Sequence, residues 1–372
     1  MKICFLCSDI KFGGIQRVAV TLANSLVQQG VPIDFVALRG KGEFRPHLVS
    51  SVRFTDLDCT SQPLGLLFPS SPLARYLKEE KPDTVLSFGN STNNLAAWAK
   101  RLLGFQYRLI VSEHSTFGAR MAGDAAFHRW RRTVRSRFLY RQAELCLCVS
   151  QGVADDLVGL KVVPPEKTRV IYNPVYDSRL QEQALCPVEH PWLQPGNPPV
   201  VMSAGRLVKL KGLGDLLKAF RLLRRDWDIP SRLMILGDGP ERASLEKLAR
   251  SLGVGDDVAF VGFQENPYAY MSKASAFALT SHFEGFASVL AEALACGLNV
   301  VSTDCRSGPR EILKGGKWGR LVAVGDVPAL AEALRSTLTT PLPAEMLKRR
   351  AEYFSVQKAS DAYREILQGK ID

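Results

Sequence analysis

The 372-residue sequence has no long apolar run. None approaches the roughly 18 consecutive residues that a helix needs to cross a bilayer. The opening stretch, MKICFLCSDIKFGG, becomes polar too soon for a signal peptide. We therefore expect the protein to stay in the cytoplasm. The proportions of hydrophobic (46%) and charged (23%) residues are those of a soluble globular protein.

Cysteine is present but not patterned. The eight cysteines are scattered, and the C-x-x-C pair of Cys4 and Cys7 falls in a predicted strand. An odd spacing in a strand sends the two side chains to opposite faces, which argues against a redox or metal site. We expect buried free thiols in a reducing compartment and predict no metal site.

Known DNA-binding motifs and aromatic platforms for stacking bases are also missing, so we predict no nucleic-acid partner. The net charge of +11 is nevertheless uneven. Residues 1–180 hold 24 Lys and Arg against 15 Asp and Glu, whereas the remainder holds 24 against 22. An acidic partner would therefore meet mainly the first half of the chain.

The length predicts two domains of ordinary size. Strand and helix patterns alternate over residues 2–172 and again over 200–323, which predicts an α/β protein with two parallel, doubly wound, Rossmann-like sheets. Such domains in tandem face each other across a cleft at the carboxyl ends of their strands. Six prolines within residues 174–199 mark a linker. The predicted segments are an N-terminal domain (1–175), a linker (176–198), a second domain (199–355) and a closing helix (356–372).

Residues 276–298, AFALTSHFEGFASVLAEALACGL, run from an apolar strand through a polar corner into a helix. If the stretch were helical throughout, Glu284 and Glu292 would lie on nearly the same side, about 12 Å apart along the axis. The backbone N–H groups of the corner would attract an anion such as phosphate. The residues of this predicted anion cradle are Gly285, Phe286, Ala287 and Ser288.

The neighbours of Glu292 are apolar, so its carboxylate needs a partner from the protein or from a ligand. The alternative is that Glu284 and Glu292 are two exposed helix carboxylates. A carboxylate at each end of an anion cradle is typical of a site for a ligand whose hydroxyls flank a phosphate. Sugar nucleotides have that shape.

Arg206 and Lys211 follow the first strand of the second domain, in GRLVKLKG. Both would project from a loop at the carboxyl end of that strand, where a diphosphate could bind. An isolated pair of this kind is usually just solvated, but its position beside the predicted cradle favours binding. Gly237, in the loop after the next strand, joins the predicted donor-binding set.

In the first domain, Gly13 and Gly14 lie between a strand and a helix, where backbone can approach a phosphate. They fall short of a complete G-x-G-x-x-G motif, and a tight turn with positive φ is the equal alternative. His114 ends a strand and could donate a hydrogen bond to a sugar hydroxyl or phosphate, although a lone histidine is more often structural. We expect His282 to be structural.

Residues 127–140, FHRWRRTVRSRFLY, form a predicted basic helix. No acidic residue lies between Asp124 and Glu144, and aromatic and aliphatic residues recur at helical spacing. Such a helix lies on anionic lipid, or it packs its apolar stripe on its own domain and leaves its arginines solvated. The charge of this half favours the membrane. The predicted contact residues are Arg129, Trp130, Arg132 and Arg135.

The order and spacing of several motifs resemble the retaining glycosyltransferases of the GT-B fold, family 4. The motifs are GGIQRVAVTLANSL (13–26), VSQGVADDL (149–157), VIYNPV (170–175), GRLVKLKG (205–212), LGDGPER (236–242), HFEGFASVLAEALACG (282–297), SGPREIL (307–313) and GRLVAVGD (319–326). One departure is Asn173-Pro174-Val175, where the family commonly has Asn-Gly-Val and where proline stiffens the turn.

The resemblance implies a nucleotide-diphosphate sugar donor, bound chiefly by the second domain, and no cofactor. Arg206 and Lys211 match residues that hold the diphosphate. Glu284 matches a glutamate that contacts the donor sugar, and Glu292 matches one that holds the ribose.

For the first domain, the resemblance implies that Gly13 and Gly14 approach the phosphate and sugar, and that His114 contacts the sugar. It also implies front-face displacement in which the leaving diphosphate helps to deprotonate the acceptor. Because cationic groups would meet the charge on that diphosphate, a metal ion is not required.

The leading hypothesis is a transferase on the inner face of the cytoplasmic membrane. It would move a hexose or N-acetylhexosamine from a UDP-sugar to a lipid-linked or lipopolysaccharide glycan. One alternative is the same reaction on a soluble metabolite or protein. A second alternative is a non-catalytic donor-binding subunit of a glycan assembly complex, although the retained glutamates and basic residues argue against that loss.

Overall fold

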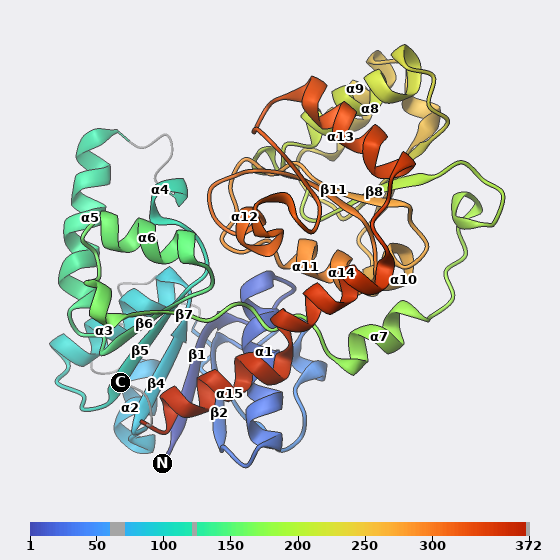
Figure 1. Cartoon of the computed structure of the whole chain (residues 1–372). Helices are drawn as coiled ribbons and strands as arrows, with labels where there is room; N and C mark the ends of the chain where they lie inside the picture. Colours follow the sequence, from blue (N-terminus) through green and yellow to red (C-terminus); the bar gives the residue numbers. More distant parts are fainter. Residues whose placement is uncertain (60–70, 121–124, 370–372) are drawn as a thin grey trace. The chain divides into compact units, whose positions relative to one another are not determined.

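The computed structural model describes residues 1–59, 71–120 and 125–369, with the side chains of residues 119, 120 and 126 left aside. The chain divides into two compact units, Met1–Pro174 with Val356–Asp372, and Val175–Ser355 (Figure 1). Residues 370–372, the end of the predicted closing segment, lie outside the described residues. In the described part of the chain, no helix combines the length and apolarity that a bilayer crossing requires.

The first unit is built on a sheet of seven parallel strands in the order β3-β2-β1-β4-β5-β6-β7. Its strands are β1 (Ile3–Asp9), β2 (Ile33–Arg39), β3 (Arg53–Asp56), β4 (Thr84–Phe88), β5 (Arg108–Glu113), β6 (Leu145–Cys148) and β7 (Thr168–Val170). Its helices are α1 (Gly14–Gln28), α2 (Pro72–Glu80), α3 (Asn90–Leu102), α4 (Phe117–Arg120), α5 (Ala126–Tyr140), α6 (Gln151–Gly159) and α15 (Val356–Leu367).

Helices α1 and α15 lie side by side in Figure 1 and share one hydrophobic core with the sheet. The Ser25 hydroxyl of α1 donates to that of Ser360 in α15 at 2.9 Å. Five successive residues at the start of β1 are buried, as expected where helices cover both faces of a parallel sheet. Cys4 and Cys7 belong to this strand and are buried free thiols.

The second unit repeats the plan with six parallel strands in the order β10-β9-β8-β11-β12-β13. Its strands are β8 (Val200–Ala204), β9 (Arg232–Leu236), β10 (Val258–Gly262), β11 (Ala276–Leu279), β12 (Val300–Thr303) and β13 (Arg320–Val322). Its helices are α7 (Ser178–Ala184), α8 (Leu213–Arg221), α9 (Arg242–Ser251), α10 (Pro267–Met271), α11 (Ser288–Ala295), α12 (Pro309–Ile312), α13 (Val327–Thr339) and α14 (Ala344–Ala351).

The segment 176–198, which the prolines mark as a linker, is grouped with the second unit. It holds α7, which packs against α10. The Asn266 side chain donates to the Gln183 carbonyl at 2.8 Å, and the Ser272 hydroxyl donates to the Ala184 carbonyl at 2.7 Å. The predicted α/β class with two parallel, doubly wound sheets is confirmed.

Candidate functional site

The loops after β8 and β11 bring opposite charges together at one edge of the second sheet. The Nζ atom of Lys211 lies 2.6 Å from Oε1 of Glu284, and the Ser281 hydroxyl donates to the same oxygen at 2.6 Å. A small pocket at this edge is lined by Arg206, Lys211, Thr280 and Ser281, among others. The structure therefore brings the predicted cationic pair and the first predicted carboxylate into one cluster.

Glu284 lies in the polar corner, ahead of the helix that follows it. Helix α11 begins only at Ser288, and Ala287 before it adopts the left-handed conformation with φ of 69°. The helical spacing considered for Glu284 and Glu292 therefore does not apply, because the chain turns sharply between them. This turn leaves Glu284 beside Lys211 and sets the N-terminus of an eight-residue helix at the corner. That end carries the positive pole of the helix dipole.

Packing against Phe354 and the Gly308 loop holds the corner in place. The ring of Phe286 is 2% exposed and packs on that of Phe354, with centroids 5.4 Å apart. Gly308, with φ of 88°, passes so close that a Cβ there would lie 2.2 Å from the Phe286 carbonyl oxygen. Gly285 is also buried. The cradle is therefore held by close packing of the backbone.

Glu292 is 7% exposed on α11 and accepts a hydrogen bond from the Tyr268 hydroxyl at 3.4 Å. The prediction that this carboxylate has a partner is confirmed, and the alternative of two exposed helix carboxylates is wrong.

A further buried group, Cys305, lies near the ion pair of Glu284. Burial, with a smaller contribution from the Glu284 carboxylate, raises the pKa of Cys305 to about 12, so this thiol stays protonated.

Arg206 is exposed and makes no ion pair with any residue that the structure describes. It follows Gly205, whose carbonyl oxygen would lie 2.0 Å from a Cβ on Gly237. Gly237 has φ of 120° and its N–H donates to the Gly262 carbonyl at 2.7 Å. Glycine at 237 is therefore needed to bring together the loops that follow β8, β9 and β10.

Gly13 and Gly14 of the first unit are exposed at the start of α1. Gly13 is extended, with φ of −177°, and Gly14 is also outside the positive-φ region, so the alternative of a positive-φ turn is wrong. A Cβ on Gly14 would meet nothing within 4 Å. The chain's own packing does not require glycine at this position.

His114 directly follows β5 in the first unit and is partly buried. Its Nε2 lies 3.0 Å from the Ser112 hydroxyl, and its ring is 6.1 Å from that of Phe88. The end of β5 is anchored by Glu113, which is fully buried and accepts hydrogen bonds from Tyr140 of α5 and Asn93 of α3. Burial and the Glu113 carboxylate raise the pKa of Tyr140, so its hydroxyl remains a donor.

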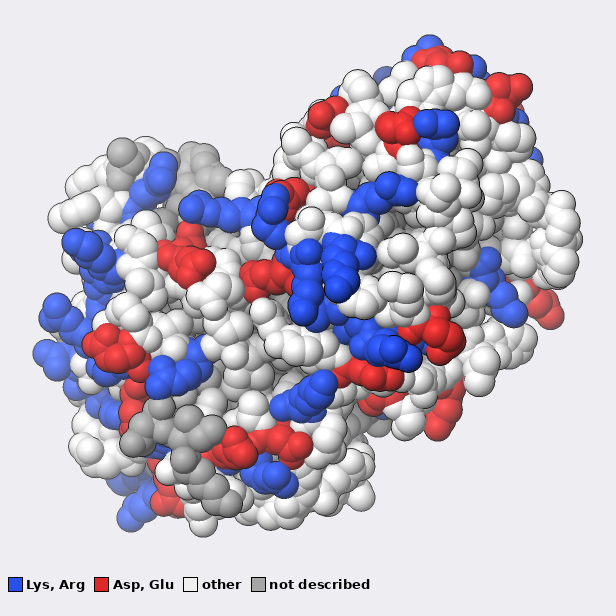
Figure 2. All heavy atoms as spheres, in the orientation of Figure 1, with Lys and Arg blue, Asp and Glu red and all other residues white. Residues whose placement is uncertain are grey.

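Helix α5 presents its apolar stripe to solvent. Phe127 is 62% exposed, Trp130 61%, Val134 41% and Phe138 39%. The alternative in which this stripe packs on its own domain is therefore wrong for Phe127 and Trp130, whereas Phe138 does pack on Trp98 of the same unit. Figure 2 shows Lys and Arg side chains gathered on the side of the first unit where Figure 1 draws α5.

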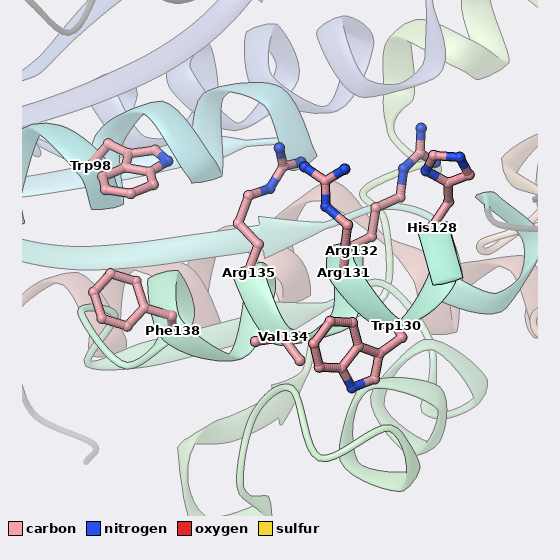
Figure 3. A pocket seen from close by; sticks show the side chains of 8 residues that line it. All are labelled: Trp98, His128, Trp130, Arg131, Arg132, Val134, Arg135 and Phe138. Atoms are coloured by element: carbon pink, nitrogen blue, oxygen red, sulfur yellow. The ribbon is translucent and has the colours of Figure 1, made fainter. Parts of the chain in front are cut away.

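A pocket of about 570 Å³ lies along α5 and reaches Trp98 of α3, which packs on Phe138 with ring centroids 6.1 Å apart. In Figure 3, Arg135 projects on the side of α5 nearer Trp98, and Trp130 projects on the other side. The predicted contact residues Arg129, Trp130, Arg132 and Arg135 are all exposed.

Solved structures share this fold. The galactose transferase WaaB of the lipopolysaccharide outer core matches with a TM-score of 0.74, 21% identity and full coverage of both chains. Anabaena HepE, solved with UDP and glucose, matches with a TM-score of 0.80 and 21% identity over 99% of each chain. The two units are thus the Rossmann-like domains of the GT-B fold, the fold of a large class of glycosyltransferases.

Sequence comparison gives the family. A model of "Glycosyl transferases group 1" matches residues 189–354, and one of "Glycosyltransferase Family 4" matches residues 12–179. The chain belongs to the family 4 glycosyltransferases and is a transferase enzyme.

Two named relatives illustrate this membership. The N-acetylgalactosamine-N,N'-diacetylbacillosaminyl-diphospho-undecaprenol 4-alpha-N-acetylgalactosaminyltransferase of Campylobacter jejuni is 32% identical over 77% of this chain and 76% of its own length. The lipopolysaccharide core biosynthesis glycosyltransferase LpsE of Rhizobium meliloti is 27% identical over 97% of each chain.

Sequence reasoning missed several groups that shape the site. Ser281 shares the carboxylate oxygen that Lys211 contacts, and the Thr280 hydroxyl donates to the Lys211 carbonyl at 2.9 Å. The only sequence signal for them was their place in the polar corner after β11. Gly308 lies in the SGPREIL motif, but its close approach to Phe286 depends on two loops that are separate in sequence.

Proposed function

We propose that this enzyme transfers a hexose or N-acetylhexosamine from a UDP-sugar to a lipid-linked or lipopolysaccharide glycan, with retention of anomeric configuration. The observation that carries the donor assignment is the cluster of Lys211, Glu284 and Ser281 beside the N-terminus of α11, with the exposed Arg206 lining the same pocket as Lys211 and Ser281. Cations and a helix N-terminus suit a diphosphate, and a carboxylate suits sugar hydroxyls.

The acceptor assignment draws on the relatives. The Campylobacter relative is named for a diphospho-undecaprenol acceptor and the Rhizobium relative for lipopolysaccharide core biosynthesis. The UDP donor is supported by the fold neighbour that was solved with UDP and glucose.

In the proposed reaction, positive charge grows on the sugar ring and negative charge on the departing diphosphate. Arg206, Lys211 and the N-terminus of α11 stabilise that negative charge, and no metal ion is needed for this role. Glu284 holds the transferred sugar and Glu292 holds the ribose. The leaving diphosphate takes the proton of the acceptor hydroxyl as that oxygen attacks the anomeric carbon from the same face.

The first unit contributes to donor binding through Gly13 and Gly14, which are exposed at the start of α1, and through His114. We infer that Gly14 stays small to admit the ligand, because nothing in the described chain fills the space beside it. His114 is the proposed hydrogen-bond donor to the donor sugar. Gly237, Gly285, Phe286, Ala287 and Ser288 are the further proposed donor-binding residues.

We also propose that α5 rests on an anionic membrane surface, on the inner face of the cytoplasmic membrane. Four apolar side chains of this helix are exposed among arginines, the pattern of a helix that inserts shallowly between lipid headgroups. Arg129, Trp130, Arg132 and Arg135 are the proposed contacts. Each basic residue near such a surface contributes about 1 kcal/mol of attraction.

The transfer is tested by incubating the protein with a panel of UDP-sugars and membrane lipid acceptors, and by measuring UDP release. At least one donor should be turned over, with Glu284→Gln much slower than the wild type. NMR of the anomeric proton in the product should show retained configuration. No turnover, together with no protection by UDP against heat unfolding, would reject the proposal.

Vesicle flotation separates membrane acceptors from the alternative of a soluble metabolite or protein. Reversing Arg129 and Arg132 to glutamate should weaken binding to anionic vesicles at least tenfold. Lys273 and Arg349 are exposed on the second unit and serve as the charge-matched control when reversed in the same way. Equal binding by the two double variants would exclude α5 as the membrane contact.

A further inference from the structure

We propose that His282 and Asp215 are positioning residues of the donor site, which act on Lys211 and Glu284 through the loops that carry them. The inference rests on the proposed function. Nε2 of His282 lies 3.2 Å from Oδ2 of Asp215. Because a carboxylate only accepts hydrogen bonds, Nε2 carries the proton in this contact. The pair therefore joins the corner after β11 to the first turn of α8.

The backbones of the same two loops are also joined. The His282 N–H donates to the Leu210 carbonyl at 2.8 Å, and the Thr280 hydroxyl donates to the Lys211 carbonyl at 2.9 Å. Gly212, with φ of 60°, allows this approach, since a Cβ there would lie 2.1 Å from the Thr280 carbonyl oxygen and 3.1 Å from Nε2 of His282. Hydrogen bonds therefore hold the Lys211 loop on both sides of Gly212. Two lie before it, at the Leu210 and Lys211 carbonyls, and one lies after it, at the Asp215 carboxylate.

The pair does not belong to the pocket that Arg206 and Lys211 line. His282 and Asp215 line a separate pocket of about 280 Å³, together with residues that include Lys209 and Glu241. Both side chains are partly exposed, 41% for His282 and 24% for Asp215. They act on the donor only by fixing where Lys211 and Glu284 sit, and a misplacement of about 1 Å in such groups can cost 10²-fold in rate.

The test measures kcat and UDP affinity for the full-length enzyme. His282→Ala should lower kcat about tenfold and weaken UDP binding, measured by calorimetry, about threefold. His282→Gln keeps an N–H donor toward Asp215 and should recover most of both losses. Lys218→Ala is the matched control, because Lys218 contacts the other oxygen of Asp215 at 3.5 Å from an exposed position. It should stay within twofold of the wild type.

A second series distinguishes positioning from a general loss of stability. If His282 acts through Lys211, His282→Ala should cost less than twofold more in kcat once Lys211→Ala is present. A full tenfold cost in that background would overturn the proposal, and so would an unchanged kcat and UDP affinity in His282→Ala. Failure of the wild type to transfer any sugar would count against the proposed function, while the UDP affinities would still test His282.

Discussion

The proposed donor-binding glycine Gly14 of the first unit differs in its surroundings from three glycines around the proposed site of the second unit. In the second unit, added Cβ atoms at Gly212, Gly237 and Gly308 would lie 2.0 to 2.2 Å from the backbone oxygen of another loop. In the first unit, a Cβ on Gly14 would meet nothing within 4 Å. Glycine at these three positions of the second unit therefore lets loops pack together, whereas Gly14 has open space beside it.

The units also differ in charge. Residues 1–180 carry most of the net positive charge, and α5 exposes arginines beside aromatic rings. In the second unit, Lys211 is paired with Glu284 and hydrogen-bonded loops surround the pair. From this contrast we propose that the second unit holds a preorganised site for a small, defined ligand. The first unit offers an open surface that suits a larger acidic partner.

The largest expected effect tests the preorganised site. Replacing Lys211 with alanine removes the cation that we propose stabilises the leaving diphosphate, and should lower kcat by at least about 100-fold. Lys209→Ala is the control, since Lys209 is exposed two residues away on a different pocket. Steady-state UDP release measures both variants. Equal activities would remove Lys211 from the proposed mechanism.

A pair of glycine substitutions tests the packing contrast directly. Gly212→Ala should destabilise the second unit by about 2 kcal/mol or more, because the positive φ and the Thr280 oxygen both oppose a Cβ. Gly14→Ala should change stability by less than about 0.5 kcal/mol, since its site is open and helical. Thermal unfolding followed by circular dichroism compares them. A similar loss for both would break the comparison.

A smaller effect is expected at Glu292, the proposed ribose anchor. Glu292→Gln keeps the shape of the side chain and the hydrogen bond that it accepts from Tyr268. It should weaken the hydrogen bonds to the two ribose hydroxyls, because the charge is lost. The donor KM should rise about five- to tenfold with kcat within threefold, because ribose is held equally in the ground and transition states. Initial rates at varied donor concentration measure this. A loss confined to kcat would contradict the anchoring role.

The smallest effect concerns Gly14 and the ligand itself. Because Gly14→Ala leaves the chain's own packing intact, any change in kcat/KM reports a ligand that approaches this position. We expect a decrease of about threefold to tenfold, measured by UDP release under the conditions used for the other variants. Full activity in a stable Gly14→Ala protein would show that the ligand stays away from this position.

Much of the fold was predictable from periodicity. Alternating apolar strands and amphipathic helices predicted both sheets, and the predicted strand that holds Cys4 and Cys7 is β1. The sharp turn at Ala287, just before α11, was not predictable, because this alanine adopts a left-handed conformation that local preference disfavours. The surrounding contacts of Phe286 with Phe354 and Gly308 are what hold that turn.

The site was predictable as a set of residues but not as a geometry. The sequence placed Arg206, Lys211 and Glu284 at strand ends, and parallel strands bring such ends to one edge. It did not reveal that Lys211 and Glu284 form an ion pair or that His282 meets Asp215. Both contacts depend on how closely the loops after β8 and β11 approach each other. Gly212 permits that approach, because a Cβ at this position would collide with the Thr280 carbonyl oxygen.

The most direct test of a preorganised donor site in the second unit is calorimetric titration of UDP into the full-length protein. We predict that Arg206→Ala combined with Lys211→Ala weakens UDP binding at least 100-fold, whereas Gly14→Ala weakens it by no more than fivefold. Unchanged UDP affinity in the double variant, or a greater loss in Gly14→Ala, would contradict the account.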